Sequence, residues 1–235
     1  MDIILYALFI VALIISAYAQ IKVSSTFNKY SRVMTGHGRT AMDAARMILD
    51  SHGLYYVRIE RVGGHLTDHF DPRDNVLRLS QSVYDSTSAA AVGVAAHEAG
   101  HAIQHAENYF PITLRSKLVP ITNIASRFTW ILILLGSLLM AFGALGGIGY
   151  YCMLAGVALF SVTTVFQLVT LPCEYNASSR AMAELTASGW YDERELKASK
   201  RVLSAAALTY VAALLVSAIQ LLRFILILAS RNNRR

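Results

Sequence analysis

A run of 46 consecutive residues without Asp, Glu, Lys or Arg occupies positions 128–173 of this 235-residue chain. One membrane-spanning helix needs about 20 predominantly apolar residues, so the run is long enough for two. Its middle contains glycines at positions 143, 146, 147 and 149, and such a cluster is typical of a tight turn. The run therefore predicts a hairpin of two membrane helices, residues 128–145 and 150–171.

Two further apolar stretches predict two more membrane helices. Residues 202–222 carry no charge and precede Arg223, whose long side chain is expected to reach the membrane interface. Residues 3–19 are apolar and end in Ala-Tyr-Ala, which resembles a signal-peptidase site. Because this segment begins with Asp2 and has no Lys or Arg, we expect a retained first helix rather than a cleaved signal.

Composition agrees with a membrane protein, since 55% of the residues are hydrophobic, 15% are charged and the mean hydropathy is +0.45. The net charge of +6 comes without a nucleic-acid-binding motif, so we expect no nucleic acid partner. Cys152 and Cys173 would lie about 30 Å apart along one helix, so no disulfide between them is predicted.

Basic residues near the span ends predict the side of the membrane. They gather on the large loop between the first two spans, and positive loops are typical of the cytoplasmic face of the plasma membrane. These residues are Lys22, Lys29, Arg32, Arg115, Lys117 and Arg127. The tail RNNRR favours the opposite orientation, because four spans would place it outside, so the topology stays open.

The loop itself predicts a small α+β region. Thr40 and Gly53 are expected to start and stop a helix, and the period-two stretch YYVRIERV predicts a strand. HLTDHF and VLRLS read as two strands joined by the turn DPRDN. A helix is expected over residues 87–107, with Ser88 as its N-cap.

We therefore expect a mainly α membrane protein with about four membrane helices and a small α+β region. Five segments follow from this division. They are a first membrane helix (1–22), a cytoplasmic-face region (23–127), a membrane hairpin (128–172), a connector helix (173–201) and a last membrane helix (202–230).

The stretch AAHEAGHAIQH, residues 95–105, contains His97-Glu98-x-x-His101. On a helix, positions i and i+4 lie about 40° apart and one turn along, so the two imidazoles can bind one Zn²⁺ from the same side. Glu98 can then take a proton from water and pass it to a leaving amine. The alternative is a pair of exposed histidines on a surface helix.

His105 is a less suitable ligand than its position suggests. It lies eight residues after His97 and is rotated by about 80° around the helix. A third zinc histidine in this context follows the pattern HExxHxxGxxH, in which a glycine turns the chain back. No glycine lies between His101 and His105, so we expect His105 at the surface or beside the ligands.

Glu174 is the candidate for the third ligand, because it follows the uncharged run, where a carboxylate without a partner is costly. Pro172 is expected to open a helix there, on which Ala177 and Ala181 would allow close approach to the histidine helix. The alternative is a helix N-terminal glutamate stabilised by the helix dipole.

Three separated motifs, GHLTDHFDPRDNVLRLS, AAHEAGHAIQH and EYNASSRA, together resemble the neutral zinc metallopeptidases of the YugP type. The last motif is more distantly similar to the ExxAD signature of HtpX and the CAAX prenyl proteases. The resemblance implies that the small α+β region is a zincin-like catalytic unit. It further implies a gluzincin-like site with one Zn²⁺ held by His97, His101 and Glu174, and Glu98 as general base. Ser178 stands where those proteases have Asp, and it can orient a ligand histidine only as a neutral acceptor.

Other parts of the site are candidates only. The strand Asn75, Val76, Leu77, Arg78, Leu79, Ser80 is expected to be an edge strand that pairs with the substrate backbone, as in related zinc peptidases. His69, Arg180 and Tyr175 are candidates for stabilising the transition-state oxyanion, although each has an ordinary structural role as its alternative.

The sequence thus predicts a zinc-dependent endopeptidase in the membrane, acting on peptides or membrane proteins close to the bilayer. One rival is a metal-dependent transporter, against which the uncharged hairpin argues, since ion paths usually contain intramembrane polar residues. The other is a non-catalytic membrane scaffold with a structural zinc site, for which Cys173 would supply a fourth ligand.

Overall fold

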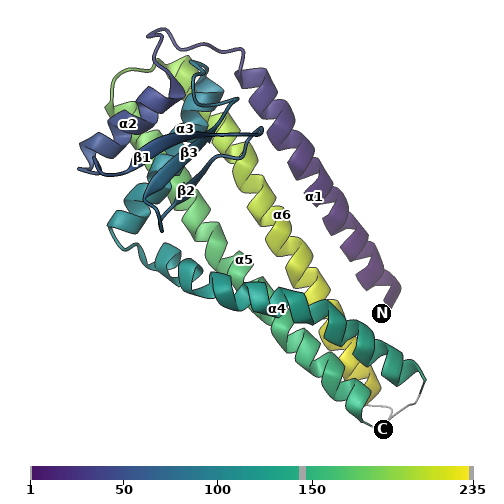
Figure 1. The fold of residues 1–235 in the computed structure, drawn as a ribbon. Coiled ribbons are helices and arrows are strands. Elements are labelled where there is room, and N and C mark those ends of the chain that lie inside the picture. The colour runs from purple at the N-terminus through teal and green to yellow at the C-terminus, as the bar shows by residue number, and fades with distance from the viewer. Residues whose placement is uncertain (1, 143–146, 233–235) are drawn as a thin grey trace. The chain divides into compact units, whose positions relative to one another are not determined.

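The computed structural model describes residues 2–142 and 147–232, which form six helices and three strands. In chain order these are α1 (Asp2–Tyr30), α2 (Ala41–Ser51), β1 (Arg58–Val62), β2 (His69–Asp71), β3 (Val76–Ser80), α3 (Ala89–Ala106), α4 (Phe110–Ala141), α5 (Ile148–Ala187) and α6 (Glu193–Asn232) (Figure 1). The chain divides into two compact units. The helical unit comprises Met1–Ala17, Leu114–Thr170 and Tyr210–Arg235, and the sheet unit comprises Tyr18–Thr113 and Leu171–Thr209.

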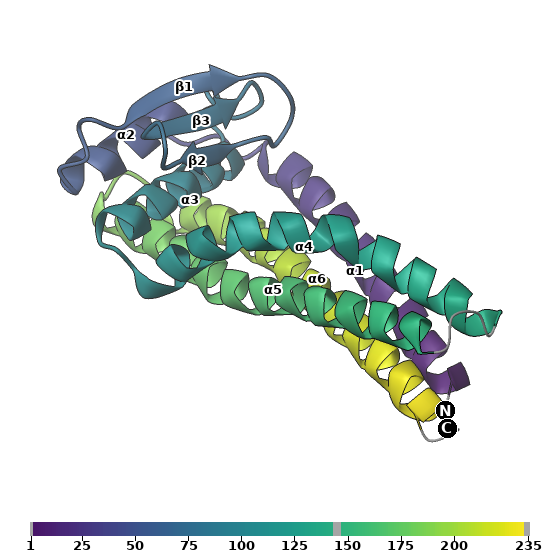
Figure 2. The ribbon, with the colours of Figure 1, turned by 60° about the horizontal axis from the view of Figure 1, so that its bottom comes forward.

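The sheet unit contains a three-stranded mixed sheet of order β1-β3-β2. β1 runs parallel to β3, and β2 pairs antiparallel with β3 through the short turn predicted from Pro72 and Asn75. Figure 2 shows the sheet beside α2 and α3. Large side chains without solvent exposure fill the core between these elements: Ile48, Leu49, Leu77, Leu79 and Ile103.

Local capping signals place the helices of this unit where the sequence predicts them. The Thr40 hydroxyl accepts from the Asp43 backbone N–H, and the Asp43 carboxylate accepts from the Thr40 N–H, which completes a capping box at α2. The Ser88 hydroxyl accepts from the Ala91 N–H at the start of α3. Both predicted N-caps are therefore confirmed.

The expectation that residues 75–80 form an edge strand is wrong. Val76–Ser80 is the central strand, since it pairs along its whole length with β1 and over Val76–Arg78 with β2. The burial of Val76, Leu77 and Leu79 explains this position, because a strand covered on both faces and both edges loses access to solvent. The short strand β2 is the edge that lies closest in the fold to α3.

The helical unit is built around the close pairing of α4 and α5. A Cβ added at Gly136 would lie 2.5 Å from the backbone N of Met153, so the two backbones touch there, as small residues permit between membrane helices. Trp130, Phe160 and Phe224, from α4, α5 and α6, contact one another edge to face.

Arg223 does not stand alone among these apolar helices. Its Nη1 donates to Gln220 Oε1 over 2.8 Å, and its guanidinium lies 4.3 Å from the ring centroid of Tyr6 and 4.7 Å from that of Phe9. Cation–π contacts of this kind compensate a charge in an apolar setting.

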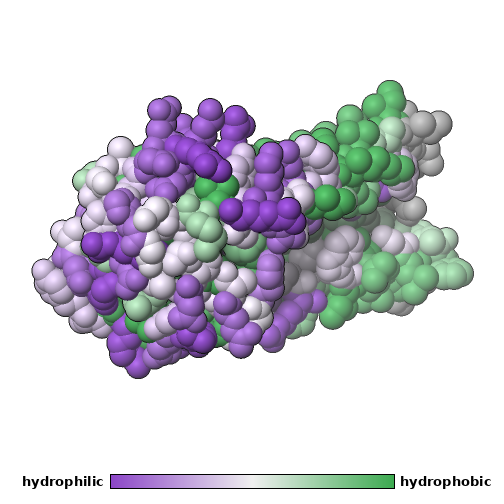
Figure 3. Space-filling model, turned by 90° about the horizontal axis from the view of Figure 1, so that it is seen from above, coloured by the Kyte–Doolittle hydropathy of each residue, from purple (hydrophilic) through white to green (hydrophobic). Residues whose placement is uncertain are grey.

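Within the described residues, four helices are long and apolar enough to cross a membrane, as predicted: Tyr6–Tyr30, Phe110–Ala141, Ile148–Ala187 and Glu193–Ser230. Large apolar side chains project outward from them, among them Ile14, Leu134 and Leu168, each more than half exposed. The surface of the helical unit is mainly hydrophobic, and that of the sheet unit is mainly hydrophilic (Figure 3). Exposed apolar surface of this extent indicates a lipid environment.

The helices are longer than the segments predicted from hydropathy. α4, α5 and α6 each run without interruption across the predicted boundaries at 127/128, 172/173 and 201/202. The expectation that Pro172 opens a helix is wrong, since Pro172 lies inside α5, and membrane helices tolerate such prolines because neighbouring groups satisfy the freed backbone. Of the predicted glycine turn, positions 143 and 146 lie outside the described residues.

Candidate metal centre

The candidate site begins with two histidines on α3. His97 and His101 lie one turn apart, and their ring centroids are 4.7 Å from each other. His101 is buried and His97 is nearly so, with 11% and 13% of their side chains exposed. The burial removes the alternative of two exposed surface histidines.

Glu174 of α5 completes a three-residue cluster with them. Its Oε2 lies 3.2 Å from His97 Nε2 and 3.5 Å from His101 Nε2, and only 2% of its side chain is exposed. A carboxylate this deeply buried is costly unless it is paired or coordinates a metal, which favours a cation among these three residues. The structure thus brings together the three residues that the resemblance implies as ligands.

The approach of the two helices depends on Gly100. A Cβ at this position would lie 2.7 Å from the carbonyl oxygen of Ala177 and 3.3 Å from its Cα. Real Cβ atoms do not come this close to a backbone, so only glycine allows α5 to lie here against α3. Since Gly100 directly precedes His101, this contact sets the distance between His101 and Glu174.

The cluster fits a zinc ion. One donor atom from each of the three residues lies within 4.8 Å of the others. Tetrahedral zinc with bonds of about 2.0–2.1 Å places its ligand atoms roughly 3.3 Å apart, close to the two measured separations of 3.2 and 3.5 Å. Two imidazoles and a carboxylate are the donor set of a common class of catalytic zinc site.

A buried amide fixes the orientation of His101. Gln104 Nε2 donates to the Cys173 carbonyl over 2.8 Å and to Asn176 Oδ1 over 2.9 Å. These bonds use the amide as a donor, so Gln104 Oε1 must accept from His101 Nδ1, 2.9 Å away. The resulting tautomer carries its proton on Nδ1 and leaves the Nε2 lone pair of His101 directed at Glu174, ready for a metal.

His97 is held in a similar way by Ser178. The hydroxyl oxygen of Ser178 lies 3.1 Å from His97 Nδ1, so Nε2 again points to the cluster. A neutral hydroxyl is a weaker acceptor than a carboxylate. The structure therefore places Ser178 beside the ligand histidine, as the sequence predicts, with one neutral hydrogen bond.

Arg180 lies at the outer end of the same network. Its Nε donates to Asn176 Oδ1 over 2.8 Å, and its Nη2 pairs with Glu107 Oε2 at 2.7 Å. The hydrogen bond from Arg180 lowers the pKa of Glu107. Arg180 thus supports Asn176 and, through Gln104, the orientation of His101, and its guanidinium is engaged with Glu107.

Glu98 is half-buried and follows His97 on α3. The Glu98 carboxylate is near enough to Asp68 for its charge to affect the pKa of Asp68. Burial raises the pKa of Asp68, hydrogen bonds from the Ser80 backbone N–H and hydroxyl lower it, and the charge of Glu98 raises it further. The carboxylates of Asp68 and Glu98 are therefore close enough to interact electrostatically.

His69, Tyr175 and His105 are the other residues that the sequence analysis singled out near the site. His69 lies exposed on β2 with Nδ1 2.8 Å from the Thr67 carbonyl, and Tyr175 is 52% exposed. His105 packs on the Phe70 ring at 5.6 Å between centroids. Neither His105 nor the Cys173 thiol belongs to the group of metal-binding donors found in the described part of the chain.

Sequence reasoning missed Gln104, Asn176 and Asp68. Gln104 is completely buried, and a polar residue three positions after a ligand histidine in an otherwise apolar helix is a usable signal, because i and i+3 share a face. Asn176 and Asp68 carry no comparable local signal, since their roles depend on contacts between separate elements.

Comparison with known proteins points in the same direction. The family described as "Putative neutral zinc metallopeptidase" matches residues 5–229. A Bacillus subtilis (strain 168) protein described as "Putative membrane protease YugP" is 50% identical over 218 residues, which cover 93% of each chain. No solved structure matches the chain.

Proposed function

The chain belongs to the neutral zinc metallopeptidase family, and we propose that it is a zinc-dependent endopeptidase for membrane or membrane-proximal proteins. One observation carries the proposal. His97, His101 and Glu174 form the whole group of clustered donors in the described residues. Catalytic zinc sites keep three protein ligands and one open position, whereas structural sites are closed by four, so the catalytic alternative is favoured over the scaffold.

The three ligands would hold one Zn²⁺ per chain. Bound there, zinc supplies Lewis-acid chemistry that polarises a scissile carbonyl and acidifies water. Gln104 and Ser178 keep both Nε2 atoms aimed at the ion, so the site is preorganised.

Glu98 is proposed as the general base. It accepts the proton of the attacking water and passes it to the leaving amine, which a carboxylate next to a ligand histidine is placed to do. His69 and Tyr175 remain candidates for donating a hydrogen bond to the oxyanion. Arg180 is less suited to this task because Glu107 and Asn176 already engage it.

The substrate backbone is proposed to pair with β2 rather than with β3. β2 is an edge of the sheet and packs beside α3, where the ligand histidines lie. An extended peptide that adds to such an edge gains main-chain hydrogen bonds without a sequence requirement. The site would then hold the peptide between β2 and α3.

Membrane substrates are proposed because Glu174 lies on the same continuous helix as a candidate membrane span. The carboxylate and the span are thus joined without a flexible linker. Basic residues on the loop between the first two spans favour a site on the cytoplasmic side of the plasma membrane.

The decisive experiment compares purified wild type with Glu98→Gln. We expect the variant to keep one bound zinc per chain, measured by atomic emission, while peptide cleavage falls about 10²- to 10⁴-fold. Glu184→Gln is the matched control, since it makes the same change on a partly exposed α5 carboxylate paired with His52, and it should cleave normally. Unchanged cleavage by Glu98→Gln would contradict its role, and absence of zinc from wild type would contradict the zinc site.

Substrate class needs a separate test. The same cleavable sequence is presented once within a membrane-inserted helix hairpin in nanodiscs and once as a soluble peptide. We expect faster cleavage of the inserted form, and a preference for the soluble form would contradict the membrane-substrate proposal while leaving the zinc chemistry intact.

A further inference from the structure

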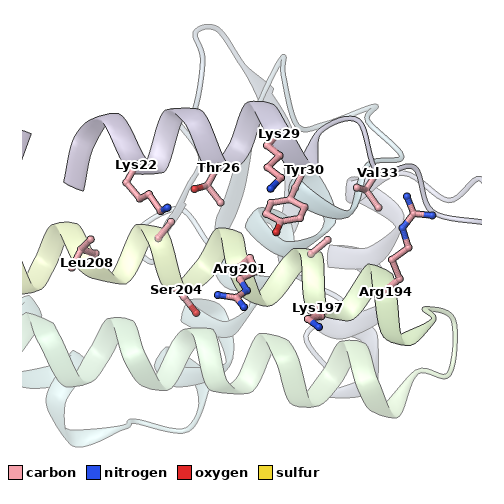
Figure 4. A pocket seen from close by; sticks show the side chains of 12 residues that line it. Lys22, Thr26, Lys29, Tyr30, Val33, Arg194, Lys197, Arg201, Ser204 and Leu208 are labelled. Atoms are coloured by element: carbon pink, nitrogen blue, oxygen red, sulfur yellow. The ribbon is translucent and has the colours of Figure 1, made fainter. Parts of the chain in front are cut away.

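A second polar site lies in the sheet unit, between the C-terminal half of α1 and the N-terminal half of α6. It is a cavity of about 620 Å³, within the range of small-molecule sites. Figure 4 shows side chains of both helices directed toward it. Its lining residues are Lys22, Thr26, Lys29, Tyr30, Val33, Arg194, Lys197, Ala198, Arg201, Ser204, Ala205 and Leu208.

The lining of this basic pocket is strongly cationic. It includes five Lys or Arg side chains and no carboxylate. Among the described residues, none of the five makes an ion pair, whereas most arginines elsewhere in the sheet unit do, as Arg78 and Arg180 illustrate. All five cations are exposed to solvent, and like charges gathered around one cavity give it a positive potential that attracts anions.

Nearby carboxylates do not neutralise the pocket. Asp192 and Glu193 line a neighbouring hollow that shares Arg194 and Lys197. Asp192 accepts from the Glu195 N–H, while Glu195 accepts from the Asp192 N–H and, through its other oxygen, from the Gly36 N–H. These three carboxylates keep their negative charges, but the five cations of the lining outnumber them, which leaves the pocket with an excess of positive charge.

The pocket lies where two candidate spans change from apolar to charged. On α1 the apolar run ends at residue 19 and Lys22 follows, and on α6 the uncharged run begins at residue 202, directly after Arg201. Along α6 the lining passes from Arg194 and Lys197 to the apolar Ala205 and Leu208. This order of charged, then apolar surface matches the order of headgroup and acyl chain in a lipid.

We propose that this pocket binds the phosphate headgroup of an anionic phospholipid. The cations attract the phosphodiester, and the Thr26 and Tyr30 hydroxyls can donate hydrogen bonds to its oxygens. The acyl chains then continue along the apolar parts of α1 and α6. Basic pockets between membrane helices recognise anionic lipid headgroups by this chemistry.

The test uses the full-length protein in a neutral detergent, with bound lipid counted by native mass spectrometry during titration with phosphatidylglycerol or phosphatidylcholine. The double variant Lys197→Gln/Arg201→Gln removes two pocket cations. The matched control Arg32→Gln/Lys200→Gln removes two exposed cations of the same region that do not line the pocket.

Wild type is expected to bind phosphatidylglycerol more tightly than phosphatidylcholine. At about fivefold per cation near a membrane surface, the pocket variant should lose roughly 25-fold in affinity for phosphatidylglycerol, and the control should stay within about twofold. Equal binding of the two lipids, or equal losses in the two variants, would overturn the proposal.

A free phosphate is the other source of the same chemistry. Inorganic phosphate at millimolar concentration is therefore added as a competitor. Phosphatidylglycerol that remains bound supports the lipid assignment. Its displacement by phosphate would overturn that assignment and identify a soluble anion site.

Discussion

The metal cluster and the basic pocket both belong to the sheet unit, yet they treat charge in opposite ways. At the metal cluster, Glu174 is 2% exposed and touches two histidines that are themselves held by Gln104 and Ser178. At the basic pocket, five cations face a cavity and none has an ionic partner among the described residues. The charged and donor side chains of the metal cluster are fixed by contacts within the protein, whereas the cations of the basic pocket have no such ionic contacts.

The difference reflects what each site is proposed to bind. A small ion with bonds of about 2 Å needs donor atoms fixed to within fractions of an ångström, and burial with hydrogen-bonded support provides that precision. A phosphate headgroup is larger and is recognised mainly by summed positive charge, so mobile Lys and Arg side chains suffice. The metal cluster is thus suited to its ion by preorganised donor atoms, and the basic pocket is suited to its headgroup by a high density of positive charge.

The largest expected effect comes from breaking the metal cluster. Glu174→Gln removes the charged ligand while nearly preserving its size, and zinc affinity should fall more than about 100-fold, beyond the loss of any supporting residue. Competition with a chromogenic zinc chelator measures this. The variant Lys197→Gln/Arg201→Gln should keep wild-type zinc affinity, and a joint loss in both variants would show that the two sites are not independent.

Removing the support for His101 should cost less. Gln104→Leu leaves the histidine but frees its ring to rotate, so we expect zinc affinity to fall about 10- to 100-fold. Ser178→Ala should reduce zinc affinity by an amount near the lower end of this range, because it removes one neutral hydrogen bond. Gln81→Leu makes the same change at an exposed turn position and should leave zinc affinity unchanged; an equal loss there would contradict the network argument.

Helix spacing supplies the next prediction. Gly100→Ala forces its Cβ against Ala177 at 2.7 Å, and overpacking of this kind costs about 1–3 kcal/mol, offset in part by the better helix propensity of alanine. Thermal denaturation in detergent should show a lower midpoint, together with weaker zinc binding. Gly93→Ala meets Ser199 Cβ at 3.1 Å, at a contact of α3 with α6 instead of α5, and should leave zinc binding intact.

The smallest expected effect concerns Asp71, whose side chain is 11% exposed and whose partner Arg73 is 86% exposed. Hydrogen bonds from Arg73 lower the pKa of Asp71 from 3.8 to about 2. Because the folded state lowers this pKa, the ion pair stabilises the fold above about pH 4, and the stabilisation is lost as the pH falls to about 2. Asp71→Asn should therefore lower the free energy of unfolding by about 0.5–1 kcal/mol near neutral pH. The difference in denaturation midpoint between wild type and variant should close as the pH falls to about 2. A gap that persists at pH 2 would contradict the ionic origin.

Much of the fold follows from local pattern. The four apolar spans, the caps at Thr40 and Ser88 and the strand pair around Pro72 appear where the sequence predicts them. The order of the strands does not follow from local pattern, because the sequence VLRLS is compatible with both an edge strand and a central strand. Only its pairing with β1, which lies earlier in the chain and parallel to it, makes it central.

The sequence alone determined what depends on neighbouring residues: the apolar lengths of the helices, and the spacing that aligns His97 with His101 on one face of α3. Tertiary structure decided what depends on separate segments meeting. It placed Glu174 3.2 Å from His97, buried Gln104 between Cys173 and Asn176, and gathered the cations of α1 and α6 around one cavity. Helical periodicity is a property of adjacent residues, whereas these contacts depend on the packing of helices far apart in the chain.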